Sequence, residues 1–163
     1  MRGLSLLFIL TGIMSCQTRQ SGMSEPPVDT TTVNRADTPT ISTDTHYFWS
    51  SEWDKKGLVM KKYSQISPDS LNPASLIQKL NTIYPQIRLH FIKISNDSIF
   101  VRISRSRYLT QQMGSSGADA YLAEVTYNLT ELRNINFVNM QFKQGDHASP
   151  GTYTRTDFIE TKN

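Results

Sequence analysis

The clearest pattern in the chain is an alternation of apolar and polar residues from Ser98 to Ser104. A period of two is typical of a strand that buries one face and exposes the other. Another strand-like segment, Leu89 to Ser95, precedes it, and Asn96-Asp97 between the two favours a tight turn. We therefore predict an antiparallel hairpin here, with further strands at Leu58 to Tyr63 and Phe137 to Phe142.

Two segments show helical spacing instead. Apolar residues recur every three or four positions after Leu71-Asn72-Pro73, and Pro85 ends that helix. The second helix, Ala118 to Leu132, has a continuous apolar stripe and Ser115 or Ser116 as its cap. The order strand, helix, strand, strand, helix, strand predicts an α+β fold, a small mixed sheet with two helices packed on one face.

The first residues have a different character. A basic start and the apolar run Leu4 to Leu10 are too short to span a membrane, which takes about 20 residues, and they fit a cleaved signal peptide. The tetrad Ile13-Met14-Ser15-Cys16 resembles the bacterial lipobox. That resemblance implies cleavage before Cys16, diacylglycerol on its thiol and an acyl chain such as palmitate on the new amine. The alternative is an ordinary signal peptide with an incidental cysteine.

Composition changes again after Cys16. The segment from Gln17 to Thr45 is rich in Ser, Thr and Pro and lacks aromatic residues, so we expect a disordered tether. As a flexible coil it would span about 30 Å. The predicted organisation is a signal peptide (1–15), a lipidated cysteine with a disordered linker (16–45), and one folded domain (46–160).

The segment from Asp97 to Gly145 resembles the GerMN family of sporulation and spore-germination domains. The residues that carry the resemblance are the strand Ile99 to Ile103, the helix sequence Gly117 to Val125 with Tyr127 to Leu132, and the closing strand Val138 to Phe142. The resemblance implies an extracytoplasmic domain used for protein contact or ring assembly. It implies no catalytic residues.

A candidate anion or partner site lies before the second helix. The start of a helix presents free N–H groups and a positive dipole end, here at Ser115, Ser116 and Gly117. Three basic residues come just before it, Arg102, Arg105 and Arg107. The alternative is that the glycines only turn the chain and the serines only cap the helix. Export argues against nucleic acid as the partner, and a net charge of +3 is too mild for non-specific binding of polyanions.

Other candidates for chemistry are weaker. Asp146-His147 with Ser149 and Asp157 could support hydrolysis, but no glycine-flanked nucleophile is present. The three histidines lie far apart and the single cysteine cannot form a zinc site with others, so we expect no metal and no cofactor. Aromatic residues gather at both ends of the domain, where they pack over sheet edges or form a patch for a partner or glycan: Tyr47, Phe48, Trp49, Trp53, Tyr153 and Phe158.

Together these patterns predict a lipoprotein of the cell envelope, anchored to the membrane and facing the periplasm or the cell exterior. We expect it to be a non-enzymatic assembly or ligand-binding module. Its partners would be the bilayer, through Cys16, and an envelope protein or further copies of the chain. The alternative function is a cell-wall hydrolase.

Overall fold

The computed structural model describes residues 45–158. The predicted signal peptide, Cys16 and nearly all of the predicted tether lie outside these residues, as do the last two positions of the predicted domain. The described residues all belong to one compact unit. Within them, the apolar core draws on residues from Phe48 to Ala148.

Four strands form the main sheet, in the order β3 (Leu89–Ser95), β4 (Ser98–Ile103), β5 (Phe137–Gln141) and β6 (Gly151–Tyr153). The β3–β4 hairpin is antiparallel as predicted, and Asn96 takes the left-handed conformation in its turn (φ 54°). Because β4 and β5 are parallel while β5 and β6 are antiparallel, the sheet is mixed. Strand β6 was not predicted from the sequence.

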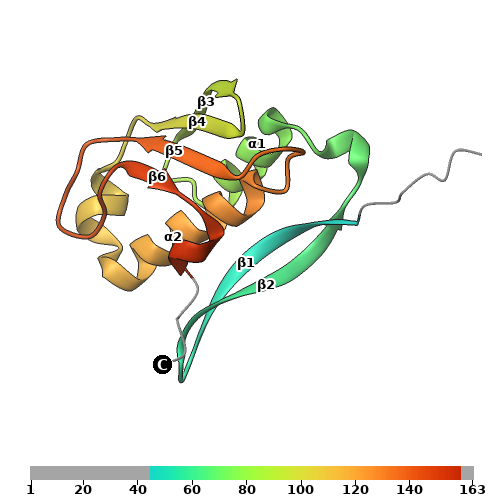
Figure 1. Ribbon diagram of the computed structural model, residues 1–163. Helices are drawn as coiled ribbons and strands as arrows, with labels where there is room; N and C mark the ends of the chain where they lie inside the picture. The colour runs from blue at the N-terminus through green and yellow to red at the C-terminus, as the bar shows by residue number, and fades with distance from the viewer. Residues whose placement is uncertain (1–44, 159–163) are drawn as a thin grey trace, which may run out of the picture. The chain divides into compact units, whose positions relative to one another are not determined.

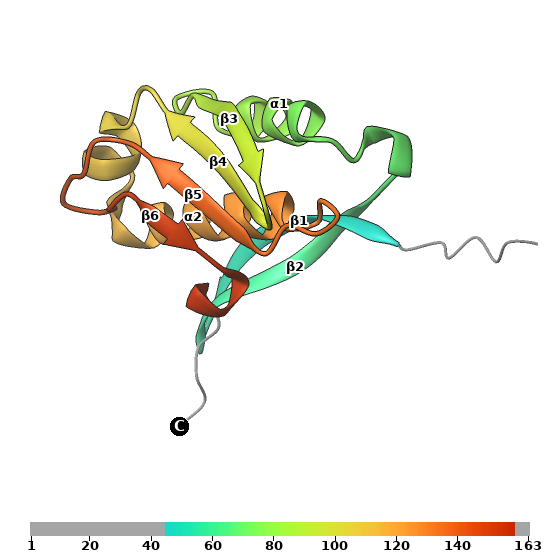
Figure 2. The ribbon, with the colours of Figure 1, turned by 45° about the horizontal axis from the view of Figure 1, so that its top comes forward.

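Two helices cover one face of this sheet (Figure 2). Helix α1 (Pro73–Ile83) begins where predicted, because the Asn72 side chain accepts a hydrogen bond from the Ser75 N–H and proline occupies the first turn. Helix α2 is Gly114–Leu129. The side chains that close the core between helices and sheet are Leu76, Leu80, Leu89, Ile99, Val101, Tyr121, Val125, Leu129, Val138 and Met140.

The bounds predicted for α2 were wrong at both ends. The helix begins four residues earlier, at Gly114, whose positive φ of 73° explains a glycine there. Neither Ser115 nor Ser116 caps it, since its N-cap residue is Met113, which makes no capping hydrogen bond with its side chain. It ends at Leu129 rather than at Leu132, and Asn134, with a φ of 62°, lies between that end and β5.

A second, two-stranded sheet holds the aromatic residues that precede α1. Strand β1 (His46–Asp54) pairs antiparallel with β2 (Gly57–Ile66), which contains the predicted strand Leu58 to Tyr63. This hairpin lies on the side of α2 away from the main sheet (Figure 1). The predicted first strand is therefore not a member of the main sheet. The α+β class is confirmed, with α2 enclosed between the two sheets.

Candidate functional site

Polar side chains of α2 and of the turn that follows it position the hairpin. Glu124, although buried, accepts hydrogen bonds from the Ser51 N–H (2.8 Å) and hydroxyl (2.6 Å). Glu131 accepts from the Tyr47 N–H (3.1 Å) and from the indole N–H of Trp49 (2.7 Å). Tyr47 and Ser51 are thus bonded through the edge of β1 that does not pair with β2. These bonds to α2 and to the turn after it fix the position of the hairpin.

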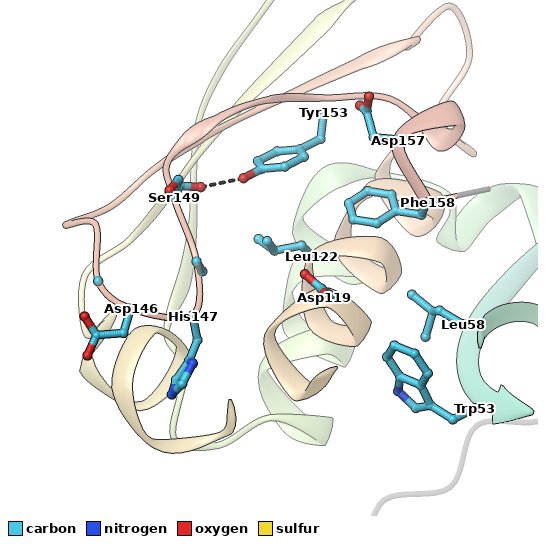
Figure 3. Close-up of a pocket in the computed structure, with 12 residues that line it drawn as sticks. Trp53, Leu58, Asp119, Leu122, Asp146, His147, Ser149, Tyr153, Asp157 and Phe158 are labelled. Atoms are coloured by element: carbon cyan, nitrogen blue, oxygen red, sulfur yellow. Dashed lines mark hydrogen bonds between the residues drawn. The ribbon is translucent and has the colours of Figure 1, made fainter. Parts of the chain in front are cut away.

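A cavity of about 510 Å³ opens between that tip, α2 and the C-terminal segment (Figure 3). Trp53 and Leu58 come from the hairpin, on the opposite side of α2 from the loop after β5. The other lining residues come from α2, from that loop and from the C-terminal end: Asp119, Leu122, Gly145, Asp146, His147, Ala148, Ser149, Tyr153, Asp157 and Phe158. We call this cavity the hairpin pocket.

Aromatic side chains from both ends of the domain meet in the hairpin pocket. Tyr153 and Phe158 stack with their ring centroids 5.8 Å apart. Trp53 is 52% exposed, so its ring offers apolar area to a ligand in the pocket. The six aromatic residues do not share one environment: Phe48 is buried in the core, whereas Trp53 is exposed and lines the pocket.

The pocket carries negative charge. Asp119, Asp146 and Asp157 line it, and no Lys or Arg does. Burial, followed by the charges of Asp119 and Asp157, raises the pKa of the Tyr153 hydroxyl, which places both carboxylates near that ring. Partial burial also raises the pKa of Asp119. A ligand that brings an apolar body and a positive charge would fit these walls.

The residues considered for hydrolysis share this pocket but do not form a catalytic chain. His147 Nδ1 lies 3.2 Å from the Ser115 hydroxyl and not beside a carboxylate. The backbone carbonyl of Ser149 accepts from the Tyr153 hydroxyl. Asp157 accepts from the Thr154 N–H (2.6 Å) and hydroxyl (2.9 Å). The Ser115 hydroxyl and His147 thus lie within hydrogen-bond reach, but among the described residues no carboxylate bonds to His147, as a Ser–His–Asp mechanism requires.

No metal site is visible in residues 45–158, since nowhere in that range do three His, Asp or Glu side chains converge. The same range contains no helix long and apolar enough to span a bilayer.

The predicted anion site is only partly assembled. Arg102 lies on the outer face of β4, and Arg105 and Arg107 follow that strand, all exposed. Gly114 to Gly117 are the first turn of α2 and do not form a separate loop. Ser115 and Ser116 are exposed, whereas a Cβ on Gly117 would touch the Met113 side chain at 3.3 Å.

Comparison of the chain with protein-family models, with curated proteins and with solved structures gives no match. The resemblances to the lipobox and to GerMN domains therefore stay predictions.

Sequence reasoning missed Asp119, Leu58 and Leu122 as pocket residues. Asp119 stands among the apolar positions of α2, where an exposed carboxylate is ordinary, so no local signal marks it. The sequence shows Trp53 in an aromatic cluster, but its exposure is visible only in the structure.

Proposed function

We propose that this protein is a lipoprotein of the cell envelope whose folded domain is a non-catalytic binding module, and that the hairpin pocket is its ligand site. The observation that carries the proposal is the lining of that pocket. Three aromatic side chains and three carboxylates surround about 510 Å³ of space, without a Lys or Arg among them. Such walls favour an organic cation, for example a protonated amine on an apolar or sugar body.

The hydrogen bonds inside the pocket support binding rather than catalysis. His147 bonds to the Ser115 hydroxyl, but among the described residues no carboxylate bonds to its imidazole, and Asp157 bonds to Thr154 instead. A hydrolase of this class also needs a third group, usually a carboxylate, to orient its base. The cell-envelope location rests on Ile13-Met14-Ser15-Cys16 and on the short apolar run before it. The resemblance of Asp97 to Gly145 to GerMN domains is in line with a role in assembly.

The ligand class is tested by calorimetric titration with tyramine and with N-acetyltyramine, which has the same ring but no charge. Tyramine should bind at least about tenfold more tightly. Trp53→Ala and Asp119→Asn should each weaken its binding. The matched controls Tyr63→Ala and Asp69→Asn change exposed residues outside the pocket and should leave it unchanged. Equal binding of both compounds, or indifference to both pocket variants, would contradict the proposal.

The hydrolase alternative is tested separately with purified cell-wall material. We expect no release of soluble fragments by the wild-type chain. Release that His147→Ala abolishes, in a variant whose melting temperature is unchanged, would assign the pocket to an enzyme instead.

A further inference from the structure

Basic side chains from four segments gather at the end of the main sheet where β4 and β5 finish. The Ser104 N–H donates to the Arg88 carbonyl (3.2 Å), and the Ser106 hydroxyl donates to the Lys143 carbonyl (3.2 Å). These bonds place the backbones of Arg88 and Lys143 beside the loop after β4. Figure 2 shows β4 and β5 ending on the side where that loop leads into α2. We call this group the basic end: Arg88, Arg102, Arg105, Arg107 and Lys143.

Nothing in the described chain neutralises the basic end. All five side chains are exposed, and the ion pairs formed within residues 45–158 involve other residues. From residue 86 to residue 113 the one acidic side chain is Asp97, in the β3–β4 turn at the far end of the sheet. The closest acidic residue along the chain is Asp146, three positions after Lys143, where it lines the hairpin pocket.

Helix α2 adds to this positive potential. Its first turn contains no acidic residue and no side chain caps it, so its positive dipole end is not offset locally. The turn η2 (Tyr108–Gln112) joins it to Arg107. The overall charge of +3 conceals this local excess of cations, because 13 of the 14 acidic residues of the chain lie outside residues 86–113.

The shape of the basic end suits a broad anionic surface. Arg88 lines a groove between α1 and β3. None of the five residues lines the hairpin pocket. A small anion would need an enclosing site, and a tight protein interface would need an apolar centre. Of the large apolar side chains exposed in residues 45–158, Ile83, Phe91, Ile92 and Ile94 lie within six positions of Arg88, and none lies from residue 95 to residue 136, the range that contains Arg102, Arg105 and Arg107.

We propose that the basic end docks on anionic phospholipid headgroups of the bilayer. Exposed Lys and Arg side chains are attracted to such surfaces, and the attraction acts within about 10 Å at moderate salt. In the cell, this contact would depend on the proposed lipid anchor at Cys16. A tether of about 30 Å would keep the domain at high local concentration beside the membrane. The contact itself does not depend on the hairpin pocket.

The test uses residues 17–163, which keep every described residue and lack the lipidation site. Co-sedimentation is measured with vesicles of phosphatidylcholine alone and with vesicles containing about one third phosphatidylglycerol. The fragment should bind the anionic vesicles, release them when salt rises from about 0.05 M to about 0.5 M, and ignore the neutral ones. Binding to neutral vesicles, or binding that salt does not weaken, would overturn the proposal.

Two triple variants locate the surface. Arg105→Gln with Arg107→Gln and Lys143→Gln should weaken binding to anionic vesicles by at least about tenfold. Lys55→Gln with Lys56→Gln and Arg133→Gln removes the same charge from exposed residues elsewhere, and should weaken binding much less. Equal losses would show an effect of net charge only and would overturn the proposal. Thermal melting of both variants should match the wild type, because all six side chains are exposed.

Preferential binding of the same fragment to polyglutamate or to single-stranded DNA would assign the basic end to a different partner and would also overturn the proposal. Because the fragment has no Cys16, absence of lipidation in cells would not alter these measurements. Failure of the anchor and failure of the docking surface are thus distinguishable.

Discussion

Asn128 of α2 pairs with both backbone groups of Trp49 in β1. Its side-chain carbonyl accepts from the Trp49 N–H (2.8 Å), and its amide donates to the Trp49 carbonyl (2.9 Å). Asn81 of α1 bonds in the same way to the N–H and the carbonyl of Leu89 in β3 (both 2.9 Å). Each helix thus closes part of a strand edge that no neighbouring strand covers.

Asn128→Ala should destabilise the domain by about 1–3 kcal/mol, because it leaves two backbone groups of β1 without partners in a part-buried place. Urea denaturation measures the loss, and hydrogen exchange should rise first in the hairpin. Asn139→Ala is the control, since its bond to Thr152 is exposed and its loss should cost far less. Equal stability of Asn128→Ala and the wild type would mean that packing alone holds β1.

Stability should fall in acid because of Glu131. Burial alone would raise the pKa of this carboxyl, but hydrogen bonds from Trp49 and Arg155 outweigh burial and hold the pKa below its usual range. A carboxyl with a lowered folded-state pKa stabilises the fold above its unfolded pKa, and that contribution is lost as pH falls toward the folded pKa. Glu131→Gln should flatten the stability curve below about pH 5. Glu52→Gln, which breaks an exposed pair with Lys61, should leave the curve unchanged.

Gly145 should not tolerate a side chain. A Cβ there would lie 2.6 Å from the Cβ of Thr110 and 2.9 Å from its backbone oxygen, and backbone cannot move aside cheaply. Gly145→Ala should therefore lower the melting temperature by several degrees and weaken ligand binding, because this loop carries Asp146 and His147. Gly117→Ala meets the flexible Met113 side chain at 3.3 Å and should have a much smaller effect. Similar melting temperatures for the two variants would show that the loop yields.

Anchoring depends on one residue outside the described domain. Cys16→Ala should abolish incorporation of labelled palmitate in cells. The variant chain should either keep its signal peptide uncleaved or be released from the membrane. Cleavage and labelling are read from electrophoretic mobility and autoradiography. Ser15→Ala keeps a small residue before the cysteine and should label like the wild type. Labelling of Cys16→Ala would refute the lipoprotein prediction.

The elements that could be predicted were those that depend on nearby residues. Pro73 and Pro85 bracket α1, and Asn96-Asp97 forms the turn of the β3–β4 hairpin, because a helix cap or a tight turn depends on a few consecutive residues. Strand β1 was missed because its edge is satisfied by side chains of α2 more than seventy residues away. Its aromatic residues were interpreted as a boundary cluster, since the sequence does not show what they pack against.

In the hairpin pocket and in the basic end alike, the sequence shows the residue types but not which of them lie close together in space. The residue types are evident from the sequence: aromatic residues at the two ends of the domain, a polar loop around His147, and basic residues after β4. By itself the sequence therefore determined α1, the β3–β4 hairpin, the α+β class and the inventory of side chains. Only the tertiary structure brought Trp53 to the same cavity as Tyr153, and Arg88 and Lys143 to the end of β4. Such contacts join segments up to a hundred residues apart, and packing of the whole core, rather than any local preference, decides which of them meet.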